Sequence, residues 1–278
     1  MSRISVHCDL QYNVQVPTSF TFAVLPANNP YQEVIAEQLV IAPELPTSRT
    51  PLEPSGHELV RLVAEPGPLS LSYDATVELS AFVAGAAPTV ETPFADLPTE
   101  VLPYLNPSRY CQSDLLDRLA MTTFGPIPAG FERVSGVCDW VYDRLEYVPG
   151  STNASTTAID VLVAGAGVCR DYAHLSMSLC RALGIPVRYV SGYALELDPP
   201  DFHGFFEAFL GDTWYLFDPT RMAPVNGLVR IASGRDAADV AFATLVGRAQ
   251  LESLVVSTVD LDHIATDPSQ IPAAISTA

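Results

Sequence analysis

Three side chains in the second half of the chain have the types and order needed for thiol catalysis. Cys169 follows Gly165-Ala166-Gly167 at the start of a predicted helix, where unpaired N–H groups and the positive end of the helix dipole favour a thiolate. His203 begins a predicted strand, and Asp218 ends the next strand after a tight turn at Gly211-Asp212-Thr213. Antiparallel pairing would place Asp218 beside His203. We therefore predict a nucleophile, a base and an orienting carboxylate.

The other four cysteines have no comparable setting. Cys180 lies eleven residues after Cys169, on the same face of the predicted helix but two or three turns deeper. Five cysteines without CxxC spacing do not fit a disulfide framework or a zinc ribbon. We predict reduced thiols, and we interpret four of them as small buried apolar residues: Cys8, Cys111, Cys138 and Cys180.

His174 is the second histidine near the predicted nucleophile. It follows Cys169 by five residues, about 500° around a helix, so the two side chains project to different sides. We interpret His174 as structural. Zinc binding is an alternative, but the paired spacings of zinc ligands are absent from the available set, Cys169, Cys180, His174 and His203. The sequence predicts no metal site and no cofactor.

The elements around these residues predict an α+β protein with two main parts. Residues 1–90 carry short β-rich runs separated by Pro, Asn and Gly, which predicts an N-terminal antiparallel β domain. Residues 91–105 are interpreted as a connection, which overlaps a Pro/Ala/Thr-rich passage from Gly85 to Pro98. Residues 106–255 are predicted to form the catalytic core, and 256–278 a C-terminal tail.

Within the core, the hydrophobic period changes from helical to extended. Helices are predicted from Ser113, over 134–145 and after the cap at Thr157, and the Cys169 helix is predicted to end at Gly184. The Cys169 helix should bury one stripe of side chains. Three strands should follow, over 187–193, 203–210 and 214–218, giving a nucleophile helix packed on an antiparallel sheet.

The catalytic segments resemble those of bacterial transglutaminase-like proteins, which have a papain-like fold. The likeness runs through three stretches: Gly167-Val168-Cys169-Arg170-Asp171-Tyr172-Ala173-His174 with 183–193, His203-Gly204-Phe205-Phe206-Glu207, and Trp214-Tyr215-Leu216-Phe217-Asp218-Pro219-Thr220. It extends to residues 107–111 and, more loosely, to the N-terminal β domain that precedes the core in bacterial members. The resemblance implies a cysteine enzyme with the predicted triad.

The sequence departs from the family pattern at Gly204, where alanine is common. We expect this small-for-small difference to leave the triad intact. The calcium-ligand loops of animal transglutaminases are not recognisable, so calcium activation is not predicted. For the oxyanion hole, the backbone N–H of Cys169 is one predicted donor. Tyr147 is a candidate for the second donor, against the alternative that it is a packed core tyrosine.

Charge and hydropathy restrict the partners. The chain has 32 acidic and 14 basic residues and a formal charge of −18, which repels nucleic acid and anionic lipid surfaces. It contains no apolar run of about 18 residues and begins without signal-peptide features. We predict a cytoplasmic protein with a peptide or protein substrate and no nucleic acid or membrane partner, and we leave its oligomeric state open.

The predicted reaction is cleavage of a peptide or amide bond through a thioester on Cys169. His203 would take the thiol proton, and Asp218 would orient the imidazole. The triad alone does not choose between water and an amine as acceptor, so transglutaminase activity is an alternative. A peptide-binding module without catalysis is the non-enzymatic alternative, and retention of all three triad residues argues against it.

Overall fold

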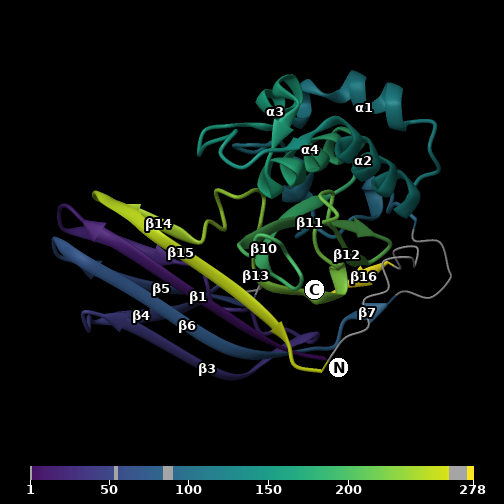
Figure 1. Cartoon of the computed structure of the whole chain (residues 1–278). Helices are drawn as coiled ribbons and strands as arrows, with labels where there is room; N and C mark the ends of the chain where they lie inside the picture. The colour runs from purple at the N-terminus through teal and green to yellow at the C-terminus, as the bar shows by residue number, and fades with distance from the viewer. Residues whose placement is uncertain (1, 53–55, 84–89, 263–273) are drawn as a thin grey trace.

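The first part of the chain forms long antiparallel strands because apolar and polar residues alternate along it. In strand β1 (Ser2–Val14), Ile4, Val6 and Cys8 are fully buried, and the residues between them are more exposed. This computed structural model describes residues 2–52, 56–83, 90–262 and 274–278. The strands of this part are the long ribbons that extend away from the helices in Figure 1.

Two four-stranded antiparallel sheets make up the β-rich part. The first has the order β15-β1-β6-β3, and the second has the order β14-β2-β5-β4. Their inward-facing side chains form one continuous core. The strands that accompany β1 are β2 (Thr18–Phe22), β3 (Gln32–Ala42), β4 (Thr47–Leu52), β5 (His57–Ala64), β6 (Gly67–Leu79), β14 (Ala243–Val246) and β15 (Ala249–Asp260).

The last two of these strands return to the N-terminal sheets from far along the sequence. Strand β15 pairs with β1 from Ile4 opposite Asp260 to Val14 opposite Ala249, and the two lie side by side in Figure 1. Strand β14 pairs with β2. The predicted boundary between core and tail at 255 and 256 therefore falls inside β15, and residues 243–260 belong to the N-terminal β structure. The predicted division of this region was wrong because backbone pairing over such a distance has no local signal.

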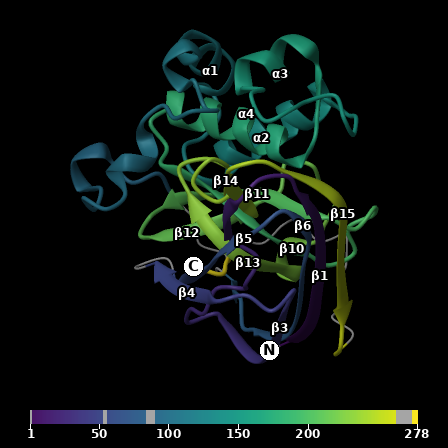
Figure 2. The same ribbon diagram turned by 90° about the vertical axis from the view of Figure 1, so that its left-hand side faces the viewer.

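Among the described residues, the second part contains four α-helices, all gathered on one side of the molecule (Figures 1 and 2). Helix α3 begins as predicted: the Thr157 side chain and the Asp160 backbone and side chain form a reciprocal capping box. The α-helices are α1 (Asp117–Phe124), α2 (Phe131–Arg144), α3 (Ala158–Ala164) and α4 (Cys169–Ala182). Short 3₁₀ turns precede and follow them: η1 (Phe94–Asp96), η2 (Leu102–Leu105), η3 (Ser113–Leu115) and η4 (Val225–Gly227).

Helix α4 is the centre of this part. Every residue from Asp171 to Arg181 is buried, so the prediction of a single buried stripe was wrong. The reason is that α4 is surrounded: it contacts α1, α2 and α3 as well as two strands of the sheet beneath it. Leu183 then caps the helix, and Gly184 follows with φ of 80°, a conformation that favours glycine.

The sheet beneath α4 has the order β12-β11-β10-β13 and is antiparallel throughout. Three of its strands were predicted, and β13 was not. Glu207 on β11 is buried between Arg188 of β10, at 2.6 Å, and Arg230 of β13, and this ion network joins the three strands. The strands are β10 (Val187–Ala194), β11 (Phe202–Leu210), β12 (Thr213–Phe217) and β13 (Leu228–Gly234). The antiparallel sheets and the helix-on-sheet core confirm the predicted α+β class.

Two further strand pairs are present in the described part of the chain. Strands β8 (Glu146–Tyr147) and β9 (Ala166–Gly167) form a short parallel pair, and β7 (Phe82–Val83) pairs with β16 (Ile275–Ser276).

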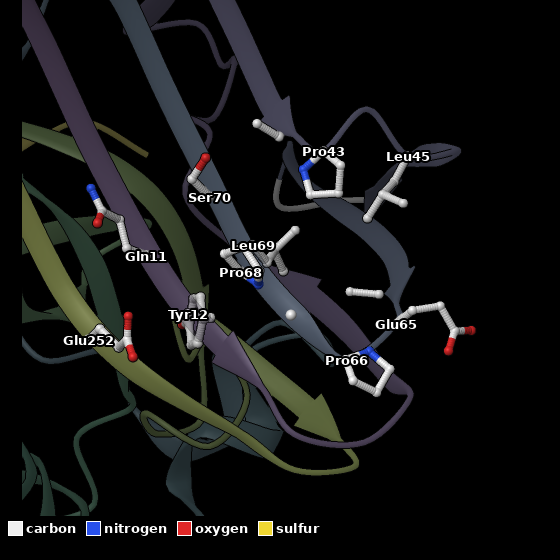
Figure 3. Close-up of a pocket in the computed structure, with 13 residues that line it drawn as sticks. Gln11, Tyr12, Pro43, Leu45, Glu65, Pro66, Pro68, Leu69, Ser70 and Glu252 are labelled. Atoms are coloured by element: carbon white, nitrogen blue, oxygen red, sulfur yellow. The ribbon is translucent and has the colours of Figure 1, made fainter.

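A pocket of about 650 Å³ opens at the far end of the β-rich part, among Tyr12, Pro43 and Pro68 (Figure 3). None of the predicted triad residues lies in it.

No helix in the described part of the chain is long and apolar enough to cross a membrane.

Candidate active site

The structure brings His203 and Asp218 into direct contact. His203 lies on β11, and Asp218 directly follows β12, which pairs with β11 through Phe206 opposite Phe217. Nε2 of His203 lies 2.8 Å from Oδ2 of Asp218, and both side chains are at most 2% exposed. The hairpin therefore places the carboxylate beside the imidazole, in the arrangement that orients a catalytic base.

Asp218 determines the charge that His203 carries. Burial disfavours the imidazolium, but the charge and hydrogen bond of Asp218, together with the contact to Cys169, raise the pKa of His203 to about 10. The pKa of Asp218 is lowered, because its charge contact and hydrogen bond with His203 and its hydrogen bonds to Thr220 outweigh burial. Within the described residues, Nδ1 of His203 has no hydrogen bond of ordinary geometry. Since Nε2 is engaged, Nδ1 is the nitrogen left for the Cys169 thiol.

Cys169 is the first residue of α4 and is partly exposed, unlike the other four cysteines, which are buried. The turn that carries it is fixed by Asp171. The Asp171 carboxylate accepts hydrogen bonds from the Val168 N–H at 2.9 Å and from the Thr152 hydroxyl at 2.6 Å. Arg170 donates to its other oxygen at 2.9 Å. The predicted nucleophile therefore stands at a helix terminus held by several hydrogen bonds, and it is partly exposed.

Gly167 is required by this turn. A Cβ on Gly167 would lie 2.8 Å from the Cβ of Asp171 and 3.4 Å from a methyl group of Val161. The glycine therefore allows the chain to pass directly against the first turn of α4 before reaching Cys169. The sequence pattern indicated a glycine-containing turn, and the structure gives the contacts that require it.

Tyr147 lies next to Cys169 because the β8–β9 pair aligns the two segments. Tyr147 is opposite Gly167, and the Val148 N–H donates to the Gly167 carbonyl at 3.0 Å. Burial raises the pKa of the Tyr147 phenol, and the charge of Cys169 and a hydrogen bond with its side chain raise it further. A hydrogen bond with the backbone of Cys169 acts in the opposite direction. The phenol is thus beside both the thiol and the first N–H of α4.

Gly204 has a specific role that its small size alone did not reveal. A Cβ at this position would lie 2.1 Å from the hydroxyl oxygen of Tyr189, which is on the neighbouring strand β10. Tyr189 is 6% exposed and packs against the His174 ring, with 5.2 Å between centroids. Glycine at 204 therefore admits the phenol next to His203, and alanine is not an equivalent residue here.

The remaining candidates, His174 and Cys180, are both buried along α4. His174 is buried, and its Nε2 accepts a hydrogen bond from the Ala237 N–H at 3.1 Å. Burial lowers the pKa of His174 to about 3. Cys180 is fully buried further along α4. Across the described ranges, no three or more His, Cys, Asp and Glu side chains are grouped so that they could hold a metal ion.

Two family models match adjoining parts of the chain. Residues 2–99 match the bacterial transglutaminase N-terminal domain, and residues 118–219 match the transglutaminase-like superfamily. The second match contains Cys169, His203 and Asp218. A crystal structure of a provisionally named cysteine protease from Cytophaga hutchinsonii is 43% identical in sequence, with a TM-score of 0.91. The comparison covers 96% of this chain and 92% of that one. The chain belongs to the transglutaminase-like superfamily.

This transglutaminase-like chain also has mycobacterial relatives, which are described as uncharacterized proteins. The Mycobacterium tuberculosis protein is 31% identical over 212 residues, 71% of this chain and 67% of the relative. The Mycobacterium leprae protein is 35% identical over 114 residues, 37% of this chain and 39% of the relative. The match to the Mycobacterium leprae protein thus spans well under half of that relative's length.

Two residues that support the transglutaminase-like site were not assigned a role from the sequence. Asp171 stands three residues after Val168, at the place where an acidic side chain often caps a helix start, so its spacing carried a usable signal. The sequence around Tyr189 gave no such signal, because the position of this side chain depends on the pairing of β10 with β11 and on the open space above Gly204.

Proposed function

We propose that this protein is a cysteine hydrolase that cleaves a peptide or amide bond through a thioester on Cys169. The observation that carries the proposal is a helix-start cysteine in contact with a buried His203–Asp218 pair. A partly exposed thiol, a buried imidazole and a buried carboxylate have the nucleophile, base and orienter roles of thiol catalysis. Membership of the transglutaminase-like superfamily supports the same chemistry.

In the proposed mechanism, the Cys169 proton passes to Nδ1 of His203. The sulfur attacks the substrate carbonyl carbon, and the resulting imidazolium protonates the leaving amine as the C–N bond breaks. Asp218 stabilises the imidazolium through Nε2, which is consistent with the raised pKa of His203. Water, deprotonated by the same imidazole, then attacks the thioester and releases the acid and the free thiol.

The backbone N–H of Cys169 and the phenol of Tyr147 are the proposed oxyanion donors. A helix-start N–H points outward because it has no partner within the helix. The Tyr147 phenol is held beside it by the β8–β9 pair. Since burial and the neighbouring thiol raise its pKa, the phenol stays protonated and can donate to the tetrahedral oxygen.

The decisive experiment separates hydrolysis from amine transfer in one assay. A mixture of unstructured peptides is incubated with the wild type and with Cys169→Ala, in the presence and absence of a fluorescent primary amine, and the products are analysed by mass spectrometry. Hydrolysis predicts cleaved or deamidated peptides that require Cys169. Covalent amine adducts would show a transglutaminase instead, and the absence of any Cys169-dependent product would contradict catalysis on peptides.

Thiol reactivity provides a test that needs no substrate. Iodoacetamide near pH 6 should label Cys169 selectively, because Cys169 is partly exposed and in contact with His203. The buried Cys180 serves as the internal control. Equal labelling of both cysteines, or of neither, would favour a binding module without catalysis.

The proposed substrate is a peptide or protein, and the proposed location is the cytoplasm. Five cysteines without a disulfide suit a reducing compartment. The strongly acidic composition is unfavourable for nucleic acid and anionic membranes as partners. Fractionation of the native organism with an antibody against this chain tests the location, and recovery outside the cytoplasm would contradict it.

A further inference from the structure

The carboxylate of Asp218 is held on both of its oxygens. Oδ2 contacts His203, while Oδ1 accepts hydrogen bonds from the Thr220 hydroxyl at 2.6 Å and from the Thr220 backbone N–H at 2.9 Å. The Asp218 side chain is 2% exposed and Thr220 is 5% exposed. Because the site is shielded, water has little access to replace a lost donor. Thr220 therefore contributes two of the three hydrogen bonds to the carboxylate that the structure shows.

The direction of the Thr220 hydroxyl is fixed by a second contact. The Met222 N–H donates to Oγ1 of Thr220 at 3.2 Å. A backbone N–H can only donate, so the hydroxyl oxygen is the acceptor in this bond. The single hydroxyl proton is then available for Asp218, where the short distance to Oδ1 is typical of a bond to an ionised acceptor. The hydroxyl is thus a directed donor.

The backbone of this turn brings the donors into place. Arg221 has φ of 58°, in the left-handed region that residues other than glycine rarely adopt, and its N–H donates to the Asp218 carbonyl at 3.3 Å. Such a conformation persists only where surrounding contacts impose it, and it is frequent at functional sites. Here it folds the chain back so that Thr220 and Met222 both face the end of β12.

We propose that Thr220 is a positioning residue whose hydroxyl fixes the Asp218 carboxylate in the rotation that bonds His203. This inference rests on the proposed function for its catalytic meaning. A carboxylate has two equivalent oxygens and turns about its last bond, so contacts on both oxygens restrict that rotation. The hydroxyl bond at 2.6 Å is the shorter of the two bonds that hold Oδ1, the other being from the Thr220 N–H at 2.9 Å. With Oδ1 tied to Thr220, Oδ2 remains on Nε2 of His203 during turnover.

The test compares three variants. Thr220→Val keeps the side-chain shape and removes the hydroxyl, and Thr220→Ser keeps the hydroxyl and removes the methyl group. Thr213→Val is the matched control, because Thr213 also donates to a carboxylate, that of Asp212 at 3.1 Å, in the turn of the same hairpin. Circular dichroism establishes folding for each variant. If Thr220→Val does not fold, Thr220→Ala is compared with Thr220→Ser in its place.

Two measurements report on the catalytic pair without a substrate. The first is the proton NMR signal of the His203 Nε2–H, which moves downfield when it is held by a carboxylate. The second is the rate of Cys169 alkylation by iodoacetamide near pH 6. In Thr220→Val we expect the Nε2–H signal to move upfield or broaden and the alkylation rate to fall about tenfold, the size expected for losing one charge-assisted hydrogen bond. Thr220→Ser and Thr213→Val should match the wild type.

An unchanged Nε2–H signal and alkylation rate in Thr220→Val would overturn the proposal. So would a Thr220→Ser variant that fails in the same way, because the methyl group and not the hydroxyl would then matter. Asp218→Asn, measured in parallel, separates the two proposals. If Cys169 alkylation is slower in Asp218→Asn but unchanged in Thr220→Val, only the role of Thr220 is contradicted. Unchanged alkylation in Asp218→Asn contradicts the triad itself.

Discussion

Two buried histidines in the same domain have opposite electrostatics. His203 and His174 are 2% and 1% exposed, so burial alone does not distinguish them. The carboxylate of Asp218, in hydrogen-bond contact, raises the pKa of His203 to about 10. Burial dominates at His174 and lowers its pKa to about 3. One ring is stabilised as the charged form and the other as the neutral form.

The difference comes from the hydrogen-bond partners that surround the ring nitrogens at each position. His203 is near the start of a strand, and the end of the adjacent strand supplies a carboxylate to one nitrogen. His174 is inside a fully packed helix, and its Nε2 accepts from the Ala237 N–H, which requires an unprotonated nitrogen. A buried histidine can therefore act as a base only where the fold places a hydrogen-bond acceptor at one ring nitrogen and an accessible proton donor at the other. The variants described below test this contrast.

The largest effect is expected at the nucleophile. Cys169→Ala should abolish turnover, because no other described thiol is accessible beside His203. Cys180→Ala, eleven residues further along the same helix, should retain turnover and lose about 1–3 kcal/mol of unfolding free energy from the small cavity it leaves. Activity assays and urea unfolding measure the two effects. Retained activity in Cys169→Ala would mean that the nucleophile has been misassigned.

The next effect is expected at Asp218. Asp218→Asn should keep the fold and lower turnover about 10²–10⁴-fold, as in other triads, because the imidazolium loses its counter-charge. The pKa of His203 should fall from about 10. The alkaline limb of the pH–rate profile, where the imidazolium is lost, should then move to lower pH. An unchanged rate and profile would remove Asp218 from the mechanism.

The same variant tests the stability linkage of His203. A folded-state pKa raised above the ordinary 6.5 adds stability that is complete below about pH 6.5 and disappears as the pH rises through about 10. The wild type should therefore lose more unfolding free energy than Asp218→Asn across this window. Parallel slopes in chemical denaturation at several pH values would contradict the pairing of His203 with Asp218.

A smaller effect is expected at Gly204. Gly204→Ala places a Cβ 2.1 Å from the Tyr189 hydroxyl, so one of the two strands must shift next to His203. We expect about 1–3 kcal/mol of destabilisation and about a tenfold loss of turnover. Tyr189→Phe combined with Gly204→Ala should recover part of this loss. Recovery should be incomplete because the ring carbons Cζ and Cε2 still lie 2.9 and 3.2 Å from the added Cβ. A double variant no better than Gly204→Ala would place the strain elsewhere.

Sequence patterns were sufficient to predict those elements whose determining contacts are local. The Thr157 cap with Asp160, the start of α4 at Cys169 and the hairpin from β11 to β12 each depend on residues within about twenty positions of one another. These patterns placed the three proposed catalytic residues close to where the structure has them. The fold class was predictable for the same reason.

Contacts between distant segments could not be predicted in this way. Strand β15 pairs with β1 across almost the whole chain, and neither strand's alternation specifies its partner. The packing of Tyr189 over Gly204 and the burial of α4 on all sides likewise depend on elements that meet only in the folded protein. Only that packing shows why glycine is needed at position 204, where a Cβ would collide with Tyr189.

The smallest effect on catalysis is expected at His174, and it is the sharpest test of the contrast. His174→Gln keeps an acceptor for the Ala237 N–H and cannot titrate, so turnover should stay within about twofold of the wild type. Because burial lowers the His174 pKa from 6.5 to about 3, its contribution to stability is complete above pH 6.5 and decreases as the pH falls toward 3. Unfolding free energy should therefore fall less steeply between pH 6.5 and 3 in His174→Gln. All other titratable groups are the same in both proteins, so the difference in slope reports the titration of His174. Equal slopes would show that the ring is not kept neutral, and a large loss of turnover would make His174 part of the active site.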